Sequence, residues 1–162
     1  MRRNGIKLST RHRAWLYGTF AVLFATGVVW WALHRFGRVE GDFGPTVNPL
    51  EPWLLKLHGA AAMVSLLVLG TLIPLHLKRG WHARRNRGSG GGMVALCVLL
   101  IVTGYALYYV GGDQLRELAS TAHLVLGFGF PAALIWHIVR GRRTTRQSNV
   151  PPPQIHPPRT PR

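Results

Sequence analysis

Four long apolar segments alternate with shorter polar segments along the chain. The apolar segments run over Ala14 to Phe36, Trp53 to Leu77, Met93 to Val110 and Leu115 to Val139. None carries an Asp or Glu in its central part. A helix needs about 20 apolar residues to cross the hydrocarbon core of a bilayer, and lipid admits only helices or closed barrels. The pattern therefore predicts an all-α integral membrane protein, folded as a four-helix bundle.

The basic residues divide unevenly between the two sides of this bundle. Sixteen of the 20 Lys and Arg residues lie before the first segment, in the Lys78–Arg87 loop, or from Arg140 onward. The other two connections hold the remaining four, together with all five acidic residues. Basic loops stay on the cytoplasmic side of a membrane, so we expect both termini to be cytoplasmic and the protein to cross a bacterial inner membrane several times. The net charge of +15 is then explained by contact with anionic membrane lipid, and it requires no nucleic acid.

The polar stretches set the expected boundaries of the chain's parts. Residues 1–13 form a basic cytoplasmic tail, 14–143 the transmembrane domain, and 144–162 a Pro-rich tail expected to be disordered. The first apolar segment lacks a small-residue cleavage site, so we interpret it as a retained helix rather than a signal peptide. Arg87 to Gly92 (RGSGGG) is expected to be a flexible turn. No repeat period is evident.

Four histidines lie inside the second and fourth apolar segments. His58 and His76 lie near the two ends of one segment, and His123 and His137 near the two ends of the other. Both helices run from outside to inside, so His58 and His123 share the outer depth and His76 and His137 the inner depth. The spacings of eighteen and fourteen residues place each helix's two histidines on one face. An ionisable side chain in a bilayer is costly, which indicates a function.

The number and type of these side chains favour haem over other metal centres. Zinc gathers four protein ligands at one point, whereas each depth here offers two imidazoles and no cluster of carboxylates or thiols. Two histidines on opposite faces of a porphyrin suit a six-coordinate haem. A single cysteine, Cys97, excludes the CxxCH attachment of c-type haem. We therefore predict two haem b groups, ligated by His58 with His123 and by His76 with His137.

The inner pair leaves an alternative open. At 1.5 Å per residue, the histidines are about 27 Å apart on one helix and about 21 Å apart on the other. Kinks at Pro74 or Pro131 could absorb this mismatch. His12, at the cytoplasmic start of the first helix, is an alternative partner for His137.

Several stretches of the chain resemble a known group of proteins. The chain is similar to small bacterial four-helix membrane proteins of the di-haem cytochrome b superfamily, a group of unknown function related to the membrane subunits of formate dehydrogenase and nickel-iron hydrogenase. The similarity is carried by LLKLHGAAAM, PLHLKRGWHARRNRGSG, TGYALYY and TAHLVLGFGFPAALIWH. It implies that His58, His76, His123 and His137 bind haem. In the formate dehydrogenase subunit one inner ligand comes from the first helix, which would correspond to His12.

These observations lead to one expected function and two alternatives. We expect a di-haem b-type cytochrome that carries electrons across the inner membrane between quinone and a redox partner protein, as a subunit of an oxidoreductase rather than an independent enzyme. The sequence shows no nucleophile–base pair or carboxylate dyad of the kind hydrolytic enzymes use. The first alternative is a cofactor-free membrane scaffold or assembly subunit with structural histidines. The second is a protein with a single haem at the outer pair.

Overall fold

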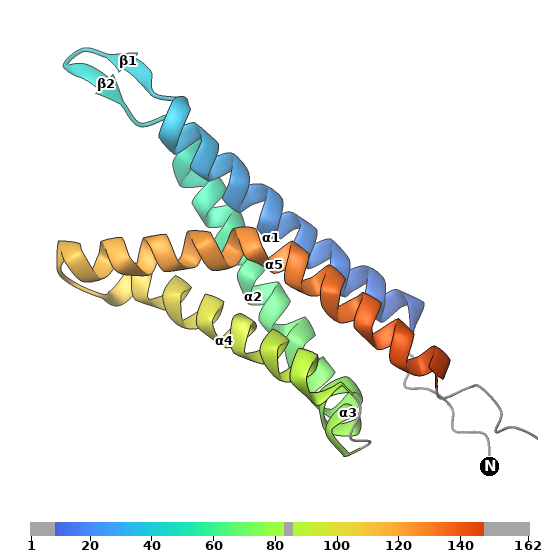
Figure 1. Cartoon of the computed structure of the whole chain (residues 1–162). Helices are drawn as coiled ribbons and strands as arrows, with labels where there is room; N and C mark the ends of the chain where they lie inside the picture. Colours follow the sequence, from blue (N-terminus) through green and yellow to red (C-terminus); the bar gives the residue numbers. More distant parts are fainter. Residues whose placement is uncertain (1–8, 83–85, 148–162) are drawn as a thin grey trace, which may run out of the picture.

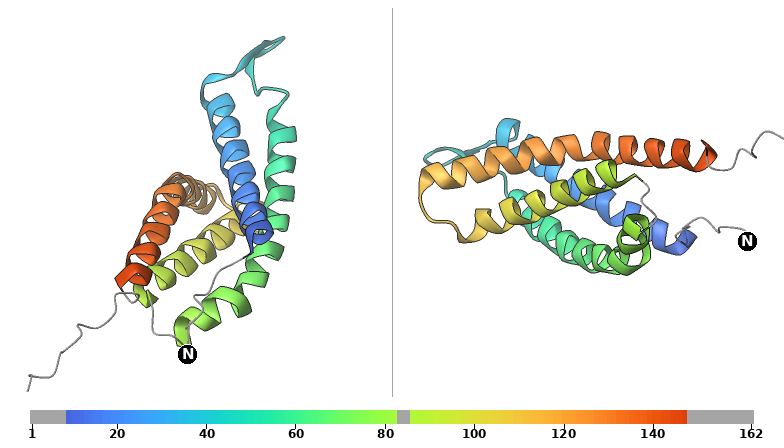
Figure 2. Two further views of the ribbon diagram at one scale, coloured as in Figure 1. Left: turned by 90° about the vertical axis from the view of Figure 1, so that its right-hand side faces the viewer. Right: turned by 60° about the horizontal axis from the view of Figure 1, so that its bottom comes forward.

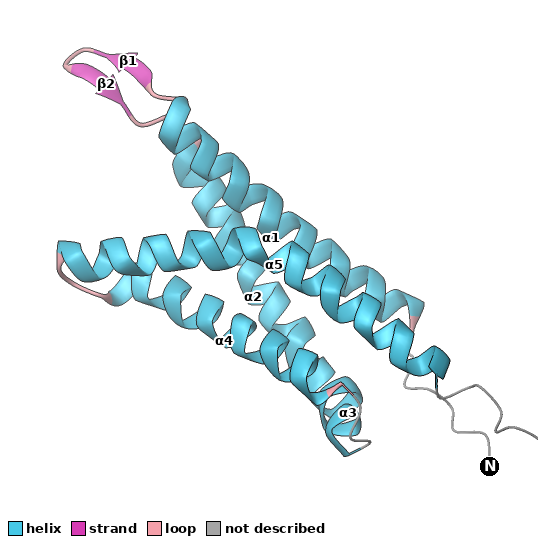
Figure 3. Cartoon of the chain, in the orientation of Figure 1, coloured by secondary structure: helices cyan, strands magenta, loops and turns pink. Residues whose placement is uncertain are grey.

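The computed structural model describes residues 9–82 and 86–147. Most of the basic N-terminal tail and of the Pro-rich C-terminal tail expected above lie outside these residues. Figures 1 and 3 show the elements in place. In chain order they are α1 (Thr10–Phe36), β1 (Val39–Gly41), β2 (Gly44–Thr46), α2 (Glu51–Leu72), the π-helical turn η1 (Ile73–Leu77), α3 (Lys78–His82), α4 (Arg87–Tyr109) and α5 (Asp113–Gln147).

Helices α1, α2, α4 and α5 are long and apolar enough to cross a membrane. The prediction of an all-α, four-helix membrane protein is therefore confirmed. Helix α1 begins at Thr10 and α5 ends at Gln147, so helical structure continues slightly beyond residues 14–143 at both ends. Pro131 lies inside α5 without interrupting it.

The four long helices form two antiparallel pairs. Helix α1 packs along α2, and α4 packs along α5. The start of α1 and the end of α5 lie at the same end of the molecule (Figures 1 and 2). Toward the other end the pairs diverge, one leading to the β1–β2 hairpin and the other to the α4–α5 turn (Figure 1). Helix α5 contacts both helices of the other pair, since His58 of α2 lies against His123 and Phe20 of α1 lies against Phe130.

Local sequence accounts for the ends of the helices. Ser9 caps α1, because its hydroxyl accepts a hydrogen bond from the backbone N–H of His12 at 3.2 Å. Pro52 stands in the first turn of α2, where no backbone N–H is needed. Gly112 adopts a φ of 91° in the turn that joins α4 to α5, a conformation that side chains disfavour.

Most apolar side chains on these helices face outward. Met63, Leu67 and Val125 are each about two-thirds exposed or more. Among the described residues, the buried apolar side chains are few, Leu16, Ala61 and Ala119. Such a surface suits a protein whose helices contact lipid rather than water.

The glycine-rich stretch at residues 87–92 is the clearest local surprise. We predicted a flexible turn there, and this was wrong, because Arg87 begins α4 and the stretch is helical. Asn86 stands just before it at a φ of 52° and redirects the chain. Ser89 is 1% exposed and faces α5, so burial of this small residue against the neighbouring helix outweighs the weak helix propensity of glycine.

Candidate functional site

His58 and His123 face each other between the two helix pairs. His58 belongs to α2 and His123 to α5, and their ring centroids are 6.3 Å apart with ring planes at 80°. The outer pair expected from the sequence is therefore brought together in the fold.

A second pair lies at the other end of the same interface. His76 belongs to η1 and His137 to α5, and their ring centroids are 6.2 Å apart with planes at 81°. The π-helical turn contains Pro74, whose ring lacks a backbone N–H and so favours a break in the α-helical hydrogen-bond ladder. The two pairs thus have nearly the same geometry at two depths.

The separation within each pair fits one metal atom between two imidazoles. With metal–nitrogen bonds of about 2.0 Å, two rings bound on opposite sides of a metal have centroids roughly 6 Å apart. In the described part of the chain, no three His, Cys, Asp or Glu side chains converge as they would around a bare metal ion. Two imidazoles at each pair match the two axial positions that the porphyrin nitrogens of haem leave for protein ligands.

Both outer histidines are held by threonine hydroxyls from the neighbouring helix. The Thr26 hydroxyl of α1 lies 3.0 Å from Nδ1 of His58. The Thr103 hydroxyl of α4 lies 2.9 Å from Nδ1 of His123. Each hydroxyl thereby orients its ring through Nδ1 and leaves Nε2 available to bind a metal.

A glycine follows each of these threonines and lies against the same ring. A Cβ atom on Gly27 would come within 3.2 Å of Cε1 of His58. A Cβ atom on Gly104 would come within 3.3 Å of Cε1 of His123. The Thr-Gly pair on each helix therefore provides both a hydrogen-bond partner and the space for the imidazole.

One inner histidine has a similar but longer contact. Nδ1 of His137 lies 3.3 Å from the hydroxyl of Ser89 on α4. Sequence reasoning identified none of the three hydroxyl residues, Thr26, Thr103 and Ser89, as site residues. The available signal was the Thr-Gly dipeptide, which occurs in both the first and the third apolar segment.

The remaining described histidines lie elsewhere. Nε2 of His12 lies 3.1 Å from the hydroxyl of Thr71 on α2, so His12 is engaged with α2 rather than with His137. Nδ1 of His34 lies 2.8 Å from a carboxylate oxygen of Glu51, which joins the ends of α1 and α2. The structure thus brings His76, and not His12, to His137.

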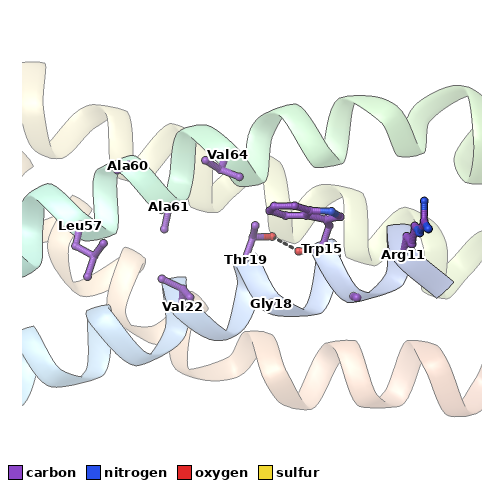
Figure 4. Close-up of a pocket in the computed structure, with 10 residues that line it drawn as sticks. Arg11, Trp15, Gly18, Thr19, Val22, Leu57, Ala60, Ala61 and Val64 are labelled. Carbon is purple, nitrogen blue, oxygen red and sulfur yellow. Dashed lines mark hydrogen bonds between the residues drawn. The ribbon is translucent and has the colours of Figure 1, made fainter. Parts of the chain in front are cut away.

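A groove of about 630 Å³ runs between α1 and α2, lined mostly by apolar side chains. Figure 4 shows it extending from Arg11 and Trp15 toward Val22 and Leu57. No histidine lines it, so it is separate from the two histidine pairs.

Comparison with known proteins gives one informative similarity. The chain is 30% identical over 131 residues to the protein-methionine-sulfoxide reductase heme-binding subunit MsrQ of Caulobacter vibrioides. The matched region covers 78% of this chain and 58% of that protein, so the chain spans little more than half the length of the relative. No protein-family model matches the chain, and no solved structure gives a significant match.

Proposed function

We propose that this protein is a membrane-embedded b-type cytochrome that binds two haems and carries electrons across the bacterial inner membrane. The observation that carries the proposal is the pair of facing histidine couples, with ring centroids 6.3 Å and 6.2 Å apart, between the same two helix pairs. The similarity to a protein named as a heme-binding subunit supports the same cofactor.

The outer haem would be held by His58 and His123, and the inner haem by His76 and His137. Iron in a porphyrin with two imidazole ligands supplies one-electron chemistry and cycles between the ferric and ferrous states. The protein's part is to hold the four imidazoles, to exclude water with apolar helices, and to set the potentials through hydrogen bonds to the ligands.

Two centres at different depths suit transfer across a bilayer. His123 and His137 are fourteen residues apart on α5, about 21 Å along the helix, whereas the hydrocarbon core is about 30 Å thick. The two histidine pairs together therefore span most of the thickness of the hydrocarbon core, so that an electron would cross it in shorter transfers between haems. A single centre at the outer pair would leave the cytoplasmic half without a carrier.

The proposed orientation places both termini in the cytoplasm and the β1–β2 hairpin outside. In this orientation the His58–His123 couple serves the external side and the His76–His137 couple serves the cytoplasmic side. We propose that quinone or quinol and a redox partner protein are the exchange partners. The relative's printed name describes a subunit of a reductase, and by analogy this chain would also be an electron-transfer subunit.

The direct test is optical. The full chain is expressed with haem in ample supply, purified in mild detergent, and measured as a dithionite-reduced minus oxidised spectrum. The proposal predicts the sharp low-spin bands of a b-type cytochrome. A colourless protein would contradict the proposal and favour a cofactor-free membrane scaffold.

Transmembrane electron transfer requires a second measurement. The protein is reconstituted into vesicles that contain ferricyanide, and dithionite is then added outside. Proteoliposomes with the parent chain should reduce the trapped ferricyanide faster than those with the double variant His58→Ala/His137→Ala. Equal rates would show that the chain binds haem without conducting electrons across the membrane.

A further inference from the structure

We propose that Thr26 and Thr103 are positioning residues that fix the tautomer and ring orientation of the two outer histidines, and thereby set the haem affinity and potential of the outer centre. This inference rests on the proposed function. Neither threonine would touch iron, because each acts through a histidine.

The contacts of Thr26 with the backbone favour one assignment of its single hydroxyl hydrogen. A threonine hydroxyl has one hydrogen to donate and lone pairs to accept. The Thr26 hydroxyl lies 2.8 Å from the carbonyl oxygen of Val22 and 3.1 Å from that of Leu23, which can only accept. With its hydrogen given to the backbone, the hydroxyl oxygen accepts from Nδ1–H of His58 at 3.0 Å.

Thr103 repeats the same arrangement on the other helix pair. Its hydroxyl lies 2.7 Å from the carbonyl oxygen of Leu99 and 3.2 Å from that of Leu100. The same hydroxyl lies 2.9 Å from Nδ1 of His123. By the same reasoning, the hydroxyl hydrogen of Thr103 goes to a backbone carbonyl, and we infer that Nδ1–H of His123 donates to the hydroxyl oxygen.

This tautomer prepares both rings for a metal. A neutral imidazole protonated at Nδ1 carries its free lone pair on Nε2. A hydrogen bond from the distal N–H also fixes the ring orientation and raises the basicity of the ligating nitrogen. The two threonines would thus leave the Nε2 lone pairs of His58 and His123 free before haem arrives.

The glycines that follow the two threonines also lie against the imidazole rings of His58 and His123. Because Gly27 and Gly104 lack a Cβ atom, each leaves space for the Cε1 atom of the neighbouring histidine. A Cβ atom at either position would contact that Cε1 atom closely. The same Thr-Gly dipeptide thus serves the same purpose on α1 and on α4. At the inner pair the corresponding contact, between Ser89 and His137, is longer at 3.3 Å.

A purely structural role for these threonines can be separated by a matched control. Thr19 lies on α1, is 8% exposed, and donates to the carbonyl oxygens of Trp15 and Leu16 at 3.0 and 3.1 Å. Figure 4 shows the Thr19–Trp15 bond. Thr19 therefore shares the buried position and backbone bonds of Thr26, but it lines the α1–α2 groove, where none of the described histidines lies.

The experiment compares Thr26→Val and Thr103→Val, which keep the side-chain shape and remove the hydroxyl, with Thr26→Ser, Thr103→Ser and Thr19→Val. The readouts are haem affinity and the midpoint potential of the outer haem. We expect each outer valine variant to lose about 10- to 100-fold in haem affinity. Where haem is retained, its potential should become more positive, because a less basic imidazole stabilises ferric iron less. The serine variants and Thr19→Val should match the parent.

Unchanged haem affinity and potential in both valine variants, with the parent carrying haem, would overturn this inference and leave the proposed function intact. An equal change in Thr19→Val would also overturn it, because the effect would then come from the helix alone. Thr26 and Thr103 lie on different helix pairs, so either one still provides the test if the other variant fails to fold. A parent without haem would overturn both proposals.

Discussion

His76 faces His137 with ring centroids 6.2 Å apart, although the two residues occupy unequal positions along their helices. His76 lies eighteen residues after His58, whereas His137 lies only fourteen after His123. The π-helical turn Ile73–Leu77 carries His76, and such a turn fits an extra residue into the helix and rotates the residues beyond it. One inserted residue accounts for about 1.5 Å of the roughly 6 Å mismatch. The helices α2 and α5 also run at an angle to each other rather than parallel (Figure 1).

The first prediction concerns the identity of the inner ligand. His76→Ala should remove one of two haems and leave the outer centre intact, because His76 faces His137. His12→Ala should keep both haems, since His12 bonds to Thr71 instead. Haem content and the reduced-minus-oxidised spectrum of each variant provide the measurement. Loss of haem from the His12 variant with full retention in the His76 variant would reverse the assignment.

The second prediction concerns the electronic structure of the ferric haems. The imidazole planes within the two pairs are at 80° and 81° to each other. Nearly perpendicular axial imidazoles leave the iron orbitals close in energy, which gives a strongly anisotropic low-spin signal. Electron paramagnetic resonance of the oxidised protein should show this signal for both haems. A conventional rhombic signal, typical of parallel imidazole planes, would contradict the ring geometry.

The third prediction uses the glycines beside the outer rings. Gly27→Ala would place a Cβ atom 3.2 Å from Cε1 of His58, and Gly104→Ala would place one 3.3 Å from Cε1 of His123. Each change should displace a ring and lower the occupancy of the outer haem, measured as haem per chain. Gly18→Ala on α1 is the control, because a Cβ atom there would meet no atom of another helix within 4 Å. Equal haem content in all three variants would show that the rings tolerate the displacement.

The fourth prediction concerns stability at the hairpin end of α1 and α2. Glu51 is 5% exposed, and its carboxylate oxygens contact Nδ1 of His34 at 2.8 Å and the backbone N–H of Asn48 at 3.3 Å. Glu51→Ala should lower the free energy of unfolding by about 0.5–1.5 kcal/mol, because it removes these hydrogen bonds while water can still reach the half-exposed His34. Thermal unfolding in detergent measures this effect. Glu117→Ala, at an exposed position, is the control and should unfold as the parent does.

The sequence was sufficient for the helices and for the pairing of His58 with His123. Apolar runs of this length predict spanning helices because the bilayer sets the required length. Histidines at matched depths then predict facing pairs, because two helices running in the same direction present equal depths to a common interior. These inferences depend on length and periodicity, which the sequence carries directly.

The contacts of Thr26 and Thr103 could not be derived in the same way. Threonine and glycine are common in membrane helices, where they also serve close packing. Whether a hydroxyl reaches Nδ1 depends on the rotation of α1 against α2 and of α4 against α5, which the sequence does not specify. The helical form of residues 87–92 was missed for a related reason, since the burial of Ser89 against α5 is a tertiary effect.

The most direct test of the account is the number of haems bound per chain. The full-length protein, purified in mild detergent after expression with ample haem, is assayed by pyridine haemochrome against a protein concentration from amino-acid analysis. The facing pairs His58–His123 and His76–His137 predict about two b-type haems per chain. A protein that binds none would contradict the account, and one that binds a single haem would contradict the assignment of the inner pair.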